Sequence, residues 1–140
     1  MRWAVEEAQV RGSAIEAVTV WSPGSTHGAG SSAAASQVQA RVLREAVAGV
    51  DPEPLISAET EIGAAEEVLV TRSEHASLLV VGSHGVGSVR HAALGSTSEY
   101  CSRMAACPVV VVPQEVPSGL RADLAVQRPG PRDRVNHSTS

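Results

Sequence analysis

Residues 78–113 constrain the fold of this 140-residue chain more than any other stretch. They contain the apolar run 78–81, a glycine-rich loop, a segment with helical character that opens at Gly95, and the apolar run 109–112. Both runs are short, rich in valine and leucine, and free of polar alternation, which is typical of strands in a parallel sheet covered on both faces. The stretch therefore predicts strand, loop, helix and strand, the second half of an α/β domain.

The loop of this stretch is marked by the spacing of its glycines. Gly82 and Gly85 stand three apart, and Gly95 follows after nine more residues. Glycine after a strand allows positive φ and lets a ligand approach the main-chain N–H groups. Such N–H groups, turned inward, form an anion cradle. The alternative is a tight structural turn that binds nothing.

The helix after the loop points to the same chemistry. Ser96 and Glu99 have the spacing of a capping box, so we expect a helix to begin at Ser96 with its free N–H groups facing the loop. Both features lie beyond the C-terminal end of the strand at 78–81, where open parallel sheets bind ligands. Capping alone would also explain the serine.

These residues carry a resemblance to a known family. Three segments carry it: Val81-Gly82-Ser83-His84-Gly85, Leu94 to Glu99, and Cys107-Pro108 before the last run. Nine residues separate Gly85 from Gly95. Together these segments resemble the C-terminal half of the universal stress protein family. The glycine pattern is similar to that of the ATP-binding members, in which it surrounds the ribose and phosphates. The resemblance extends over residues 1–113. The nucleotide-binding residues that it implies are Val81, Gly82, His84, Gly85, Gly95, Ser96, Thr97 and Ser98.

The resemblance also implies a fold and a cofactor. The fold would be an α/β three-layer sandwich of the adenine nucleotide alpha hydrolase-like type, with a doubly wound, mostly parallel sheet, and the cofactor would be ATP, with or without Mg. In the family a first, central strand carries an aspartate that contacts the nucleotide. Here the first predicted helix starts at the first residues of this sequence, with no predicted strand ahead of it. Either the start is set too far downstream or the first strand is lost. We expect an N-terminally truncated sheet of about four strands, in which the strands on either side of the gap pair directly; the alternative is that something else fills the gap.

The rest of the chain fits this class. Apolar periodicity and turn residues predict an alternation of helices at 1–11, 32–48, 63–75 and 96–105 with strands at 14–21, 55–62, 78–81 and 109–112. Right-handed crossovers between such strands give a doubly wound sheet. The polar run 55–62 suits an edge strand. Residues 114–140 are rich in Pro, Arg and Ser, and we expect a disordered tail after the domain.

Composition excludes several function classes. The chain carries a net charge of −4, three aromatic residues and no lysine, so it lacks the basic face and stacking platforms of nucleic-acid binders. No run approaches the ~20 apolar residues of a membrane span, and the start does not resemble a signal peptide, so we expect a cytoplasmic protein. Cys101 and Cys107 lack zinc-ligand spacing and suit buried, reduced thiols. No metal site is expected.

Three functions remain. We expect an adenine-nucleotide-binding regulator of stress response that dimerises through residues 109–112, since a bare valine edge is an aggregation hazard unless covered. Arg90 and His91 could reach a terminal phosphate from the loop. The alternative is a homodimeric protein-interaction module that no longer binds nucleotide. An enzyme ranks last, because phosphoryl transfer needs a charge clamp, a metal ligand and a group that orients the nucleophile, and no catalytic residue of these kinds is found.

Overall fold

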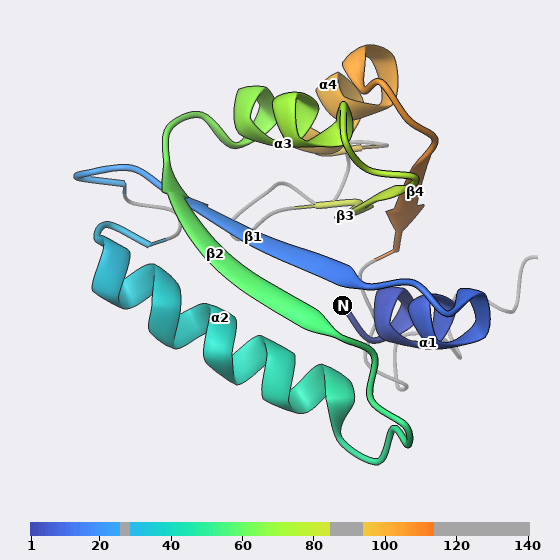
Figure 1. Ribbon diagram of the computed structural model, residues 1–140. Coiled ribbons are helices and arrows are strands. Elements are labelled where there is room, and N and C mark those ends of the chain that lie inside the picture. The colour runs from blue at the N-terminus through green and yellow to red at the C-terminus, as the bar shows by residue number, and fades with distance from the viewer. Residues whose placement is uncertain (26–28, 85–93, 114–140) are drawn as a thin grey trace, which may run out of the picture.

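Helices and strands alternate along the chain in the computed structural model, which describes residues 1–25, 29–84 and 94–113 (Figure 1). In chain order the elements are α1 (Arg2–Arg11), β1 (Ile15–Trp21), α2 (Ser32–Val47), β2 (Ile56–Ile62), α3 (Ala65–Ser73), β3 (Leu79–Gly82), α4 (Ser96–Met104) and β4 (Val109–Val112). Each predicted element is present in its predicted order. The α/β class expected from the alternation is therefore confirmed.

The strands form two separate parallel pairs. β1 pairs with β2, with Ile15 opposite Ile56, and β3 pairs with β4, with Leu79 opposite Val109. Within the described residues no ladder joins β1 to β3. The expected direct pairing of these two strands is therefore wrong.

The helices are distributed over both strand pairs. α2 packs on β1 and β2, α4 packs on β4, and α3 contacts both α4 and β1. Figure 1 shows α2 on one side of the strands and α3 with α4 on the other. α3 therefore connects the helix that packs on β4 to the first sheet.

The described core is built from small side chains. Its buried apolar residues are Val5, Ala8, Ala17, Ala35, Ala46 and Cys101. A buried amide links α2 to both strands of the first sheet by hydrogen bonds: Gln39 Nε2 donates to the carbonyls of Ala17 (2.7 Å) and Glu59 (2.8 Å). One side chain thereby binds both strands of the first sheet and leaves its own buried donors satisfied.

Helix ends follow local sequence. Ser31 Oγ accepts from the Ala34 N–H at 3.2 Å and caps α2. α1 has no side-chain cap at its start, as the absence of a capping residue predicts, and it ends at Gly12 with φ of 64°.

No helix among the described residues is long and apolar enough to cross a membrane. The same residues contain no cluster of three or more His, Cys, Asp or Glu that could hold a metal ion.

Both cysteines are free thiols, but their burial differs. Cys101 is fully buried, as expected, whereas Cys107 is only half-buried. Burial raises the pKa of the Cys101 thiol, and the negative charge of Glu66 acts in the same direction. The thiolate is thus disfavoured in the folded state relative to the unfolded one.

The raised pKa predicts a loss of stability in alkali. The unfolded chain releases the Cys101 proton near pH 8.5 and the folded chain only at higher pH, so the stabilisation is complete below about pH 8.5 and declines as pH rises above it. We expect the unfolding midpoint to fall as the pH rises above about 8.5, where the unfolded chain has lost the proton that the folded chain still holds. Urea unfolding at a series of pH values measures this. Cys101→Ala should flatten the profile, and an unchanged slope would contradict the assignment.

Candidate functional site

The end of β3 and the start of α4 are fastened to each other through Ser83. The Ser83 N–H donates to the Val112 carbonyl at 2.8 Å and so extends the β3–β4 ladder by one residue. The Ser83 carbonyl in turn accepts from the Gly95 N–H at 2.6 Å. The two ends of the predicted binding loop therefore meet at the C-terminal end of β3.

Ser98 strengthens the same junction from within α4. Its side chain is buried, and Oγ lies 2.9 Å from the Gly95 carbonyl and 3.3 Å from the Ser83 carbonyl. The hydroxyl is therefore already engaged with the backbone of the loop. Its observed role is to hold the start of α4 against the end of β3.

The start of α4 differs in one respect from the expectation. The helix does begin at Ser96, but its N-cap is Gly95, with φ of −72° and ψ of 158°, and the Glu99 N–H donates to the Gly95 carbonyl at 2.9 Å. Ser96 lies inside the first turn, so the predicted capping box is wrong. Among the described residues no side chain caps this helix, which leaves the N–H groups of its first turn for another acceptor.

The backbone conformation of Gly82 does not demand a glycine. Positive φ occurs at four described glycines, Gly12, Gly24, Gly49 and Gly63, and Gly82 is not among them. A Cβ at position 82 would stand 3.5 Å from the His84 carbonyl, an ordinary van der Waals contact. Gly82 is exposed. What this glycine contributes is a bare stretch of main chain open to approach from outside.

The structure brings together most of the predicted site residues. Val81, Gly82 and His84 lie at the end of β3, and Gly95, Ser96, Thr97 and Ser98 at the start of α4. His84 Nδ1 lies 3.1 Å from Ser83 Oγ, and its ring is half-buried. Gly85, Arg90 and His91 lie outside the described residues.

A cavity of about 690 Å³ lies at the opposite end of the strands. Its walls include residues 13–19 at the start of β1 and 78–80 at the start of β3, with side chains of α1, α2 and α3 around them. None of the predicted site residues that the structure describes lines it. The glycine loop and this cavity are therefore two distinct features of the molecule.

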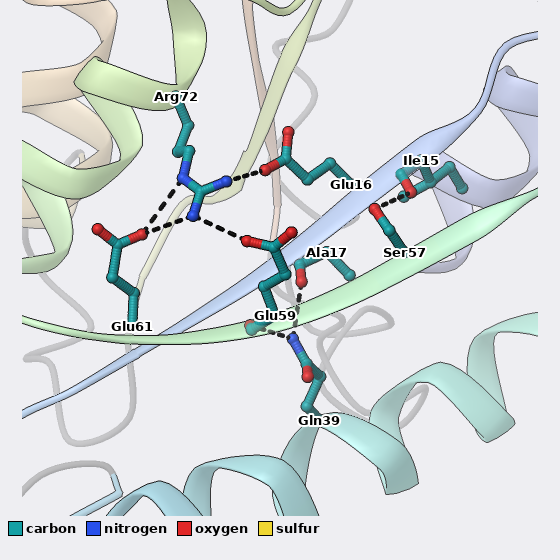
Figure 2. Close-up of polar contacts among 8 residues, drawn as sticks. All are labelled: Ile15, Glu16, Ala17, Gln39, Ser57, Glu59, Glu61 and Arg72. Atoms are coloured by element: carbon teal, nitrogen blue, oxygen red, sulfur yellow. Dashed lines mark hydrogen bonds and ion pairs between the residues drawn. The ribbon is translucent and has the colours of Figure 1, made fainter.

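A second group of charged residues escaped the sequence analysis. Figure 2 shows the guanidinium of Arg72, on α3, among the carboxylates of Glu16, Glu59 and Glu61. Nη2 lies 2.8 Å from Glu59 and 2.9 Å from Glu61, Nε lies 3.2 Å from Glu61, and Nη1 pairs with Glu16. The hydrogen bonds that Arg72 donates to Glu61 and, to a lesser extent, to Glu59 raise the pKa of the guanidinium. Glutamates within strands were the available signal, because strands are poor in Glu.

We expect Arg72→Gln to lower the thermal unfolding midpoint by several degrees. The substitution leaves three carboxylates close together without the cation that now sits among them. Because the repulsion is between partly exposed charges, 1 M salt should restore much of the loss. Scanning calorimetry in low and high salt measures both effects. Arg103→Gln, which removes an exposed pair with Glu99, is the matched control and should change little. Equal effects of the two substitutions would contradict a special role for Arg72.

Comparison with known proteins agrees with this fold. The family model described as the universal stress protein family matches residues 1–113. Universal stress proteins Rv2624c and MT2699 of two Mycobacterium tuberculosis strains are 36% identical over 118 residues, which cover 81% of this chain. The chain spans 43% of the length of these relatives.

Solved structures show the same architecture. Universal stress protein UspA from Lactobacillus plantarum superimposes with a TM-score of 0.61 at 22% identity, over 79% of this chain and 84% of its own. A universal stress protein crystallised in complex with cAMP gives a TM-score of 0.62 at 23% identity, over 79% and 82% of the two chains. With the family model matching from the first residue through β4, this chain belongs to the universal stress protein family.

Proposed function

We propose that this domain is a regulator of the stress response that binds an adenine nucleotide at the junction of β3 and α4, and that this nucleotide is ATP. The observation that carries the proposal is the 2.6 Å hydrogen bond from the Gly95 N–H to the Ser83 carbonyl. It sets the uncapped start of a nine-residue helix beside the exposed main chain of Gly82. Phosphate is the ligand that such N–H groups favour, because the helix dipole adds to their partial positive charge.

The roles within the site differ from residue to residue. Exposed Ser96 and half-exposed Thr97 offer N–H groups and hydroxyls to a phosphate, while Ser98 positions the helix. Gly82 leaves room for the ribose or phosphate to contact the main chain, and His84 borders that space. Gly85 belongs to the same loop in this proposal. Mg would enter bound to the nucleotide, as an ion carried by its phosphates.

Binding rather than turnover is the proposed activity. The sequence holds no lysine to clamp a transferred phosphate, and Arg72 is already paired with three carboxylates. We therefore propose no catalytic residue. Any hydrolysis of ATP would be slow and incidental to a regulatory role in the cytoplasm.

Calorimetric titration of the purified chain with Mg-ATP tests the proposal. We expect saturable heat in the micromolar to millimolar range and a rise in the unfolding midpoint with nucleotide concentration, since a ligand that binds the folded state stabilises it. cAMP belongs in the same titration, because a solved protein of this fold was crystallised with it. If millimolar concentrations of both nucleotides produce no heat and no stabilisation, the proposal is refuted.

Homodimerisation through β4 is the second part of the proposal. Val109–Val112 pairs with β3 on one side, and all four valines are half-buried. Within the described part of the chain its other edge has no strand partner. A second copy of β4 would cover that edge. Light scattering should report a dimer, and Val111→Lys should shift it toward monomer; a monomer at all concentrations would refute this part.

The interaction module without nucleotide remains the second candidate. The space between β1 and β3 favours it, because the β3 strand that positions the loop lacks a neighbour on one side in the described structure. The two candidates separate by fusing a strand that contains Gly and Asp to the N-terminus. Nucleotide binding that appears only in the fusion would assign the unfused chain to the interaction module.

A further inference from the structure

The first turn of α4 starts from a residue with wide backbone freedom. Its N-cap is Gly95, whose φ of −72° and ψ of 158° lie in a region that any residue can adopt. Glycine, which has no Cβ, has access to more backbone conformations than any other residue. The directions of the N–H groups of Ser96 and Thr97 depend on these two angles. A glycine at the cap therefore leaves these donors loosely oriented unless another group fixes them.

The side chain of Ser98 is placed to fix the cap angles. Ser98 is only 2% exposed, and its Oγ lies 2.9 Å from the Gly95 carbonyl and 3.3 Å from the Ser83 carbonyl. The first contact holds the cap residue, and the second holds the segment that follows β3. One hydroxyl therefore spans the same junction that the bond from the Gly95 N–H to the Ser83 carbonyl closes.

The backbone of the junction does not need this hydroxyl to satisfy its carbonyls. The Ser83 carbonyl also accepts from the Gly95 N–H at 2.6 Å, and the Gly95 carbonyl accepts from the Glu99 N–H at 2.9 Å. Removing Oγ therefore leaves neither carbonyl without a donor, and the loss of stability should be small. What the Ser98 side chain adds is a restraint on the direction in which α4 leaves the cap.

We propose that Ser98 is a positioning residue of the nucleotide site, whose hydroxyl holds the first turn of α4 so that the N–H groups of Ser96 and Thr97 meet the phosphate groups. For its ligand, this inference rests on the function proposed above. Donors that are already ordered bind an anion more tightly, because the ligand does not have to order them. The Ser98 side chain is buried and turned to the protein's own carbonyls, so its role differs from the direct nucleotide contact that the family resemblance implies.

Hydrogen exchange in the ligand-free protein tests the restraint. The Gly95 amide reports on it, because its N–H donates to the Ser83 carbonyl across the junction. Ser98→Ala should speed the exchange of this amide by at least about fivefold, as for the loss of one hydrogen bond. The amides of the β3–β4 ladder should keep the parent's rates, which a general loss of stability would not allow. Equal exchange of the Gly95 amide in the variant and the parent would overturn the proposal.

Ser102→Ala is the matched control. Ser102 Oγ donates to the Ser98 carbonyl at 2.7 Å, a hydrogen bond of the same kind that lies wholly within α4. Its removal should leave the exchange of the Gly95 amide unchanged. If Ser102→Ala speeds that exchange as much as Ser98→Ala does, the effect belongs to the helix as a whole, and the proposal is overturned.

Calorimetric titration with Mg-ATP tests the consequence for binding. Ser98→Ala should bind ATP at least about fivefold more weakly than the parent and unfold, without ligand, within about 2 °C of the parent's midpoint. Ser102→Ala should match the parent in both measurements. A Ser98→Ala variant that unfolds far below the parent would show a structural role instead and overturn the proposal.

The two proposals fail in different ways. If the parent gives no heat with ATP, the proposed function is refuted, and the ligand named here is refuted with it. If the parent binds ATP and Ser98→Ala binds it equally well, the positioning role alone is refuted and the nucleotide site stands.

Discussion

Gly82→Asp is expected to abolish measurable nucleotide binding while the protein stays folded. The glycine is exposed at the end of β3, and a Cβ there makes only an ordinary contact, at 3.5 Å from the His84 carbonyl. A carboxylate at this position would lie beside the first turn of α4 and would repel a phosphate group there. Two like charges about 4 Å apart at a protein surface repel strongly enough to weaken binding by at least about tenfold.

The same substitution at Gly30 provides the matched control. Gly30 is exposed, has open space around it and precedes the cap of α2, so it also stands before a helix but far along the chain from the β3 loop. Calorimetry with Mg-ATP and thermal unfolding should be run on both variants. Gly30→Asp should bind as the parent does, and both variants should unfold near the parent's midpoint. Full binding by Gly82→Asp would remove the β3 loop from the site.

Val5→Ala is expected to destabilise the protein by about 2–3 kcal/mol, because it removes two buried carbon atoms and leaves a cavity in a core of small residues. Val5 is 0% exposed, and α1 packs on α2 and β1. Because the described core contains few large side chains, the residues around Val5 cannot move far enough to fill the cavity. Chemical denaturation at neutral pH measures the loss.

Val10 on the same helix gives the control for Val5. It is 83% exposed, so Val10→Ala removes the same two carbon atoms from solvent instead of from the core. We expect a change within about 0.5 kcal/mol, as for most surface substitutions. Similar losses for the two variants would mean that α1 is not anchored by Val5.

Much of the fold was predictable because its elements are encoded locally. The apolar spacing along residues 32–47 and the valines of 109–112 depend on neighbours in sequence, and the structure forms α2 and β4 there. The break between α4 and the β3 loop was also placed correctly at Ser96. The capping box failed because Ser96 and Gly95 compete for the cap position, and only the observed backbone angles show that Gly95 occupies it.

The site was predictable in its members but not in their roles. Sequence spacing brought Gly82 and Gly95 into one proposal, and the Gly95 to Ser83 hydrogen bond joins the loop at those two ends. The sequence could not show that the Ser98 hydroxyl hydrogen-bonds to the carbonyls of Ser83 and Gly95, because the burial of Ser98 depends on how α4 packs. The Arg72 cluster joins residues 56 positions apart in sequence, which no local pattern relates.

The sequence by itself determined the order of helices and strands and the glycine-marked loop, because hydrophobic period, turn residues and helix starts act over a few neighbouring residues. Only the tertiary structure decided that β1 and β3 stay apart and that Arg72 gathers three glutamates. Those outcomes depend on how α2, α3 and α4 pack against the strands, and packing is a balance among residues distant in sequence.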